Sequence, residues 1–187
     1  MSWPGGSAAA AAVRAAALTA VLCPADPGEP VAVADVVQVL REHGEPGPIE
    51  LTDVDVTQMR AVAADLHAVF AAPSTAVAAR RLNLLLRAHA GPPRLSGHDG
   101  TAWHIHVDAS DRAPWAEWLA TSSAMALATL LADRQARPGG LCAAADCRRP
   151  FADLGRGARR RYCSATCASR ARVAAYRRRS RAVYPKV

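Results

Sequence analysis

Aromatic side chains are scarce in this chain, at 5% of 187 residues, although 51% of the residues are hydrophobic in the broad sense. Alanine dominates that class, so we expect a light, mainly helical core. No uninterrupted apolar run of about 18 residues occurs, which argues against a membrane span. Residues 8–22 superficially resemble an export signal, but no positive charge precedes them and Arg14 interrupts them. We therefore expect a cytoplasmic protein that does not engage a membrane.

Signatures of common enzyme classes are also missing. The chain has no P-loop, no dinucleotide-binding glycine pattern and no Gly-x-Ser-x-Gly elbow. None of its six histidines follows position 106, so the cysteines beyond residue 141 have no histidine nearby of the kind that nucleases or zinc deaminases use. His104 and His106 could share a metal on one strand face, but a solvent-facing ribbon explains them better. The sequence predicts a protein that is not an enzyme.

Acidic residues are rare in the last quarter of the chain. Residues 142–187 contain 13 basic residues against two carboxylates, whereas residues 1–141 contain 10 basic and 14 acidic residues. The formal net charge of the whole chain is +7, and every basic residue except Lys186 is arginine. A basic tail on a mildly acidic body indicates a polyanionic partner, most simply nucleic acid.

Hydrophobic periodicity and capping residues predict a helical N-terminal region. Thr52 followed by Asp55 is typical of a capping box, and Ser74 can cap the next helix. The last of these helices carries most of the large apolar residues, so we expect it to be the central packing element. The predicted helices span about 8–22, 34–43, 55–71, 75–89 and 114–134.

A short β-hairpin and a glycine-containing segment complete this region. Asp99-Gly100 is typical of a hairpin turn, which predicts a two-stranded ribbon near 94–108. Because an isolated ribbon is marginal in water, we expect its Trp103 face to lie on the helices. Pro138-Gly139-Gly140 predicts a hinge at 138–140, between a helical domain at 8–137 and a small module at 141–183.

Four of the five cysteines form two close pairs within 26 residues. They are Cys142-x4-Cys147 and Cys163-x3-Cys167. Such spacing is a strong signal for one zinc ion held by four thiolates, with no open coordination position, and hence for a structural site. We prefer this interpretation to free thiols or disulfides. The first pair fits a turn between short strands and the second a strand-to-helix corner capped by Ser164, as in a treble-clef-like finger, while Cys23 is expected to be a small buried residue.

The residues from 164 to about 182 contain no proline or glycine and predict one basic helix. Its arginines, with three that precede Tyr162, can hold phosphates bidentately or reach guanine edges. A merely solvated basic helix is the alternative. The predicted nucleic-acid-binding residues are Arg159, Arg160, Arg161, Arg170, Arg172, Arg177, Arg178, Arg179 and Arg181.

Residues 142–179 resemble the CGNR zinc finger, a small bacterial module. The matching residues are Cys142, Cys147, Phe151, Asp153, Arg159 to Arg161, Cys163 and Cys167. The namesake tetrad reads Cys-Ala-Ser-Arg here, at 167–170, so its cysteine and arginine are kept while glycine and asparagine are replaced. The run Arg-x-Arg-Val-Ala-Ala-Tyr-Arg at 170–177 is also similar to that family.

Residues from about 10 to 137 are similar in helix order and length to the ABATE domain, which usually precedes this finger in stress-induced transcription regulators. The resemblance implies a transcription-regulator architecture. Together with the zinc site and the basic helix, it leads us to expect a nucleoid-associated regulator that binds duplex DNA and carries one structural Zn²⁺. The four tryptophans Trp3, Trp103, Trp115 and Trp118 could line a pocket for a small-molecule effector in the helical domain, and a homodimer formed through that domain would add the base contacts that one finger lacks. The alternative is a zinc module that binds RNA or a protein without reading a DNA sequence.

Overall fold

The computed structural model describes residues 8–26, 28–45, 47–97, 103–110, 112–155 and 157–183, which are mainly helical with two small antiparallel hairpins. The helices are α1 (Ala8–Leu22), α2 (Val33–Glu42), α3 (Asp53–Phe70), α4 (Thr75–His89), α5 (Trp115–Arg134) and α6 (Ala165–Val183). The strands are β1 (Arg94–Ser96), β2 (His104–His106), β3 (Gly139–Leu141) and β4 (Pro150–Ala152). None of the helices in these ranges combines the length and apolar character that a membrane crossing needs.

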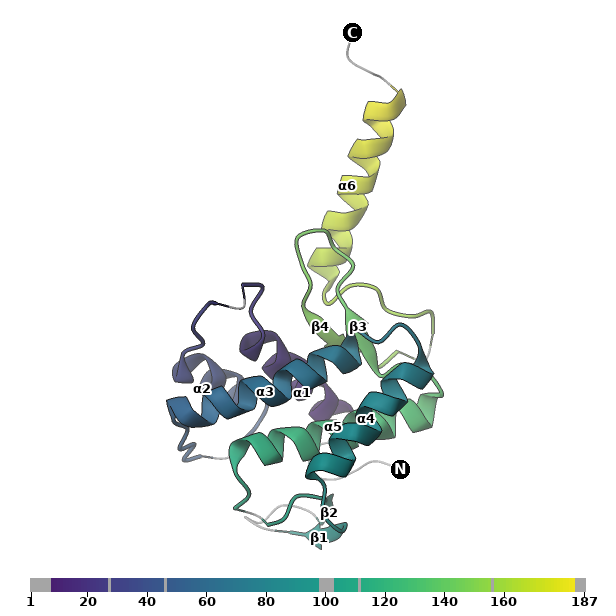
Figure 1. The fold of residues 1–187 in the computed structure, drawn as a ribbon. Helices are drawn as coiled ribbons and strands as arrows, with labels where there is room; N and C mark the ends of the chain where they lie inside the picture. Colours follow the sequence, from purple (N-terminus) through teal and green to yellow (C-terminus); the bar gives the residue numbers. More distant parts are fainter. Residues whose placement is uncertain are drawn as a thin grey trace.

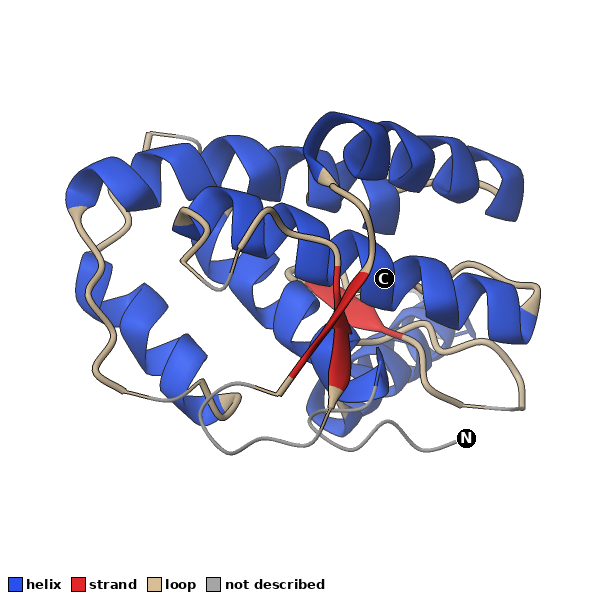
Figure 2. Ribbon diagram, turned by 90° about the horizontal axis from the view of Figure 1, so that it is seen from below, coloured by secondary structure: helices blue, strands red, loops and turns tan. Residues whose placement is uncertain are grey.

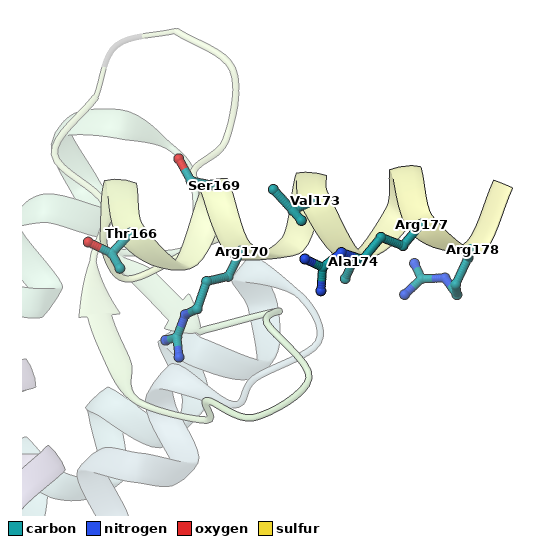
Figure 3. A pocket seen from close by; sticks show the side chains of 7 residues that line it. All are labelled: Thr166, Ser169, Arg170, Val173, Ala174, Arg177 and Arg178. Atoms are coloured by element: carbon teal, nitrogen blue, oxygen red, sulfur yellow. The ribbon is translucent and has the colours of Figure 1, made fainter. Parts of the chain in front are cut away.

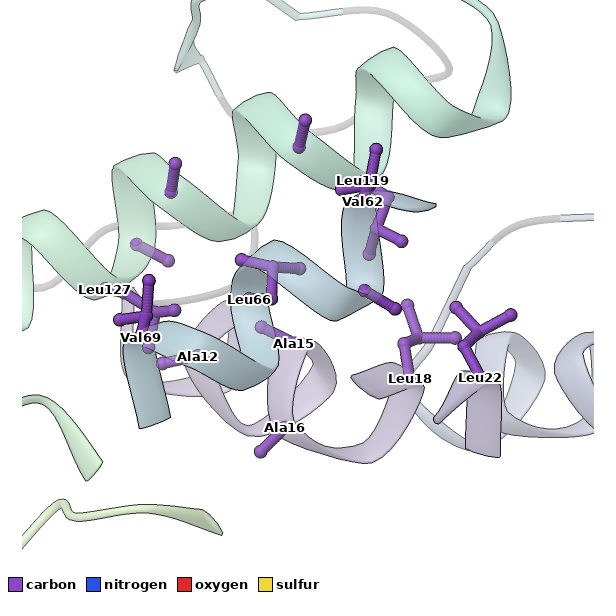
Figure 4. Close-up of a cluster of buried hydrophobic side chains, with 14 of the residues drawn as sticks. Ala12, Ala15, Ala16, Leu18, Leu22, Val62, Leu66, Val69, Leu119 and Leu127 are labelled. Carbon is purple, nitrogen blue, oxygen red and sulfur yellow. The ribbon is translucent and has the colours of Figure 1, made fainter. Parts of the chain in front are cut away.

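Helices α1, α3, α4 and α5 pack together around the main core (Figures 1 and 2). Helix α5 contacts the other three, which confirms its central place. Ala12 and Ala15 on α1 are fully buried and let that helix approach α3 and α5 closely, beside leucines such as Leu66 and Leu127 (Figure 4). Phe70 is the largest fully buried side chain. The core is therefore built mainly from aliphatic side chains, as the composition predicts.

Capping side chains define the helix ends. The Thr52 hydroxyl accepts a hydrogen bond from the Asp55 amide at 3.2 Å, and the Asp55 carboxylate accepts one from the Thr52 amide at 2.9 Å, which confirms the capping box. The Ser74 hydroxyl accepts from the Val77 amide at 3.3 Å. Gly44 follows α2 with a φ of +80°, a left-handed conformation that glycine adopts without strain. The predicted helix boundaries agree with the structure to within about two residues.

A partly buried cation joins α1 to α5. The Arg14 guanidinium lies 3.1 Å from the Glu45 carboxylate and 4.5 Å from the ring centroid of Trp118. Burial lowers the pKa of Arg14, and the negative charge of Glu45 opposes that shift. Trp118 meets Trp115 edge to face at 5.4 Å, and the Trp115 indole N–H donates to the Glu50 carbonyl at 2.7 Å. Both tryptophans thus make structural contacts within the body.

The β1–β2 ribbon forms as predicted, but the face that carries Trp103 is exposed to solvent and does not lie on the helices. Leu95 pairs with Ile105 across the antiparallel strands. The expectation that the Trp103 face lies on the helices is wrong, because Trp103 is 71% exposed and Leu95 is 68% exposed. The predicted turn at Asp99-Gly100 lies outside the described residues.

Polar groups occupy the inner side of the ribbon instead. Asp108 is buried, and its carboxylate lies 2.7 Å from the Arg94 guanidinium and 3.0 Å from Nδ1 of His106. A buried carboxylate is costly without such partners, so satisfying it turns Arg94 and His106 inward. His106 is therefore not on a solvent-facing side as expected, and the side chain of His104 lies outside the described part of the chain.

The hairpin β3–β4 docks the C-terminal segment on the helical body. Its strands pair antiparallel, with Gly139 opposite Ala152, and contact α1 and α3 (Figure 1). Gly139 and Gly140, which belong to the predicted hinge at 138–140, are buried residues of β3. A Cβ atom on Gly139 would lie 2.1 Å from the Phe151 carbonyl oxygen and 3.0 Å from the Phe70 ring. Close backbone approach, and not flexibility, explains the glycine there.

Candidate metal centre and basic helix

The first cysteine pair lies on the turn between β3 and β4, where the spacing predicts it. The Cys142 amide donates to the Arg149 carbonyl at 2.9 Å, which continues the hairpin beyond its strands. The Ala143 amide donates to the Arg161 carbonyl at 2.9 Å and ties this turn to the segment before the second pair. The backbone thus brings Cys142 and Cys147 toward residues 16 or more positions away in the sequence.

The second pair lies at the start of α6. Cys163 precedes the helix, and Cys167 is in its first turn. The Ser164 hydroxyl accepts a hydrogen bond from the Cys167 amide at 3.1 Å, which confirms the predicted cap. The Cys163 amide also lies 3.4 Å from the Cys142 sulfur, as a donor to it. The helix start and the hairpin turn therefore meet at the sulfur atoms.

The four sulfur atoms lie within 4.8 Å of one another. The Sγ–Sγ distances are 3.7 Å for Cys147–Cys163 and 3.6 Å for Cys163–Cys167. A tetrahedral zinc ion with Zn–S bonds of about 2.3 Å requires sulfurs about 3.8 Å apart, so one structural zinc fits Cys142, Cys147, Cys163 and Cys167. Cys23 is not part of this cluster: it packs, half-buried, against the helical core.

The thiols around this site differ strongly in acidity. Hydrogen bonding to Ser164 and then to Arg170 lowers the pKa of the Cys167 thiol to about 6. Burial, followed by hydrogen bonds among the cysteines, raises the pKa of Cys163 to about 12. Crowded thiols resist simultaneous ionisation, and a divalent cation relieves that repulsion because it binds the thiolate forms.

Few other apolar side chains support this part of the molecule. The buried cluster around the sulfurs contains Ala144, with Tyr162 partly buried against it. Such a cluster removes too little apolar surface from water to fold by itself. Metal coordination is therefore the main source of stability for the turn and the start of α6.

The Arg160 side chain makes several contacts within the finger predicted at 141–183. Its guanidinium donates to the Tyr162 carbonyl at 2.7 Å and to the Cys163 carbonyl, and it lies 5.2 Å from the ring centroid of Phe151. Its amide donates to the Asp153 carboxylate at 3.2 Å. These contacts brace the segment before the second cysteine pair, so the structure places this predicted nucleic-acid-binding side chain in an internal role.

Arg134 anchors the finger and was missed from the sequence. This residue, in the last turn of α5, donates to the carbonyls of Asp153 and Gly155. The Asp153 amide in turn donates to the Pro138 carbonyl at 2.9 Å. A basic residue in the last turn of a helix is the only local signal, and it does not reveal which distant carbonyls accept the bonds.

Helix α6 projects away from the body with its C-terminal half free of other elements (Figure 1). A shallow hollow runs along one side of it at helical steps of three and four residues (Figure 3). The lining residues are Thr166, Ser169, Arg170, Val173, Ala174, Arg177 and Arg178. The hollow therefore combines arginines with hydroxyl and apolar side chains, and three of its arginines are among the predicted nucleic-acid-binding residues.

The remaining predicted arginines have varied surroundings. Arg161 lies 5.8 Å from the ring centroid of Tyr162, and Arg172 donates to the Ser169 hydroxyl at 3.2 Å. The side chain of Arg181 lies outside the described residues. The other predicted arginines are exposed, and their side chains form no hydrogen bond or ion pair with the residues that the structure describes. They are Arg159, Arg177, Arg178 and Arg179.

Two comparisons with known proteins bear on this site. No curated protein matches the chain. The family model of the CGNR zinc finger matches residues 140–180, which include all four clustered cysteines and most of α6. The C-terminal segment of this chain is thus a metal-binding module that matches the CGNR zinc finger.

Proposed function

We propose that this chain is a DNA-binding transcription regulator whose zinc-held α6 contacts duplex DNA. The observation that carries the proposal is the projecting face of α6, on which Arg177 and Arg178 are exposed and make no polar contact with the described residues. The helix has no carboxylate that would neutralise them. Phosphate oxygens are the natural partners of such guanidinium groups.

The width of an α-helix suits the major groove of B-DNA. Val173 is 49% exposed and lies between arginines in the hollow, with Ser169 one turn before it. Hydroxyl and methyl groups can contact base edges while the flanking arginines bind the backbone. This mixture supports DNA more than a generic polyanion, for which an all-arginine surface would suffice.

The helical body, residues from about 10 to 137, resembles the ABATE domain, so the proposal gives it a role in regulation. A single finger offers few base contacts, so a homodimer formed through the body would supply a second half-site. The effector, if the body senses one, would then act on the spacing of the two α6 helices. Sedimentation of the zinc-loaded chain, alone and with duplex, measures whether two copies bind one DNA.

The decisive experiment is the salt dependence of duplex binding, measured by fluorescence anisotropy with zinc-loaded protein. If about six phosphates are neutralised, the log–log slope should be near −5. Replacing Arg177 and Arg178 by glutamine should shrink that slope by about 2. The matched control replaces Arg80 and Arg81, an exposed pair on α4, and should leave the slope unchanged. A flat salt response would refute the proposal.

Competition at one salt concentration separates DNA from the alternative partners. Unlabelled duplex should displace the probe at lower concentration than a single strand or a structured RNA of equal length. Stronger competition by the RNA would favour the RNA-binding alternative instead.

A further inference from the structure

Arg170 differs from the other arginines of α6 in the atom that it contacts. Its Nη2 lies 3.2 Å from the sulfur of Cys167, three residues earlier on the same helical face. Cys167 is only 4% exposed, whereas Arg170 stays at the surface and reaches inward from it. In Figure 3 its side chain leaves the half of α6 that adjoins the finger, while Arg177 and Arg178 lie farther along the projecting half.

The chemistry of the centre explains what such a donor does. A zinc ion with four thiolates carries a net charge of −2, and electron-rich thiolates are the nucleophilic form of cysteine. An N–H donor on a ligand sulfur withdraws charge from it and fixes its direction. Ser164 also hydrogen-bonds the Cys167 thiol, and the Cys163 amide donates to the sulfur of Cys142 at 3.4 Å, so Arg170 adds a cationic donor to a cluster that already receives neutral ones.

We propose that Arg170 is a positioning residue of the metal centre, which donates to the Cys167 sulfur and thereby holds this ligand on zinc and shields it from electrophiles. Donor and acceptor both belong to α6, so the same bond fixes the Cys167 side chain relative to the helix that presents it. This role is separate from the DNA contacts assigned to Arg177 and Arg178.

A variant at Arg148 separates the effect of the Arg170 hydrogen bond from the effect of losing a positive charge. Arg148 is adjacent to Cys147 in sequence and exposed, and its side chain makes no hydrogen bond with the described residues. It is therefore a basic residue next to a ligand cysteine in the sequence that has no hydrogen bond to sulfur. Arg148→Gln removes that charge and is the matched control for Arg170→Gln.

The test uses the full zinc-loaded chain and three readouts that need no DNA. These are the rate of zinc transfer to a chromogenic chelator, the rate at which iodoacetamide alkylates Cys167 as mapped on peptides, and the thiolate-to-metal charge-transfer band after Co²⁺ substitution. Arg170→Gln should speed zinc transfer and Cys167 alkylation by about tenfold or more and move the band to longer wavelength. Arg170→Lys, which retains the charge and can donate from a single nitrogen, should fall between Arg170→Gln and the unchanged chain.

Equal rates and an equal band for Arg170→Gln and Arg148→Gln would overturn the proposal. If Arg170→Gln fails to form the finger, as judged by circular dichroism and zinc stoichiometry, the lysine variant decides. Lysine rates and a band identical to those of the unchanged chain would then overturn it, and intermediate values would support it. Because no DNA is used, these outcomes are independent of the outcome of the salt titration.

Discussion

Replacing Gly139 by alanine tests whether the finger is docked rigidly on the helical body. The added Cβ would lie 2.1 Å from the Phe151 carbonyl oxygen, well inside the ordinary contact distance, and 3.0 Å from two carbons of the Phe70 ring. Neither neighbour can yield cheaply, because one is strand backbone and the other is the largest fully buried side chain of the core. The β3–β4 hairpin must therefore separate or shift as a unit.

The cost follows from what such a shift disrupts. Overpacking a core by one methyl typically costs about 1–3 kcal/mol. Displacing β4 also strains the pairing of Gly139 with Ala152 and the bond from the Asp153 amide to the Pro138 carbonyl, at about 1 kcal/mol for each hydrogen bond. We expect a loss of about 3 kcal/mol in the free energy of unfolding, or roughly 6–12 °C in Tm for a chain of this size.

Differential scanning calorimetry of zinc-loaded protein measures this loss. Gly157→Ala is the matched control in the same finger, because a Cβ there meets nothing within 4 Å and its φ is not positive. That variant should be neutral or slightly more stable, since alanine restricts the unfolded chain. If both variants melt within about 1 °C of the unchanged protein, Gly139 lies in a hinge after all and the docking argument fails.

Three further outcomes are expected. Zinc removal by a chelator under reductant, or Cys147→Ser, should reduce the helical circular dichroism signal by up to the contribution of the 19 residues of α6, because few apolar contacts other than the metal site stabilise the start of that helix. An unchanged spectrum would contradict this. Glu45→Gln should lower the free energy of unfolding in urea by about 1–3 kcal/mol, because Arg14 keeps a partly buried charge without its anionic partner, and an unchanged urea midpoint would argue against the pair. Zinc release, followed with a metal-sensitive dye, should depend more steeply on pH below about pH 6. The Cys167 thiol, with its pKa lowered to about 6, binds a proton only there, whereas Cys163, with its pKa raised to about 12, is protonated in the metal-free protein at any lower pH, so its proton opposes zinc binding throughout. Weaker zinc retention at about pH 7.5 than at about pH 5 would reverse the expected sign.

The helices and the cysteine ligands were predictable because their signals are local. The Thr52 capping box and the Ser74 cap are set by residues three positions apart, so neighbouring sequence contains both partners. The spacing of Cys163 and Cys167 likewise places both sulfurs on one side of a helix start, and zinc chemistry then requires a second pair.

The failures share a different cause. Trp103 was expected to lie on the helices. Instead, the buried carboxylate of Asp108 is paired with Arg94 and His106, which turns the polar face of the ribbon inward. This arrangement depends on Arg94 and Asp108, which lie 14 residues apart in the sequence. The internal contacts of Arg160 were likewise not predictable, because its carbonyl acceptors and the Phe151 ring become neighbours only after the finger has folded; its contact with nucleic acid stays a prediction.

The sequence by itself determined that this chain would be mainly helical, that its charge would gather at one end and that four cysteines would hold one metal ion. Each of these depends on composition or on spacing within a few residues. Only the tertiary structure decided that Gly139 is packed instead of hinged, and which arginines are engaged internally. Those outcomes depend on backbone and side chains far apart in the chain, whose contacts exist only when the hairpin, the helices and the sulfur cluster come together.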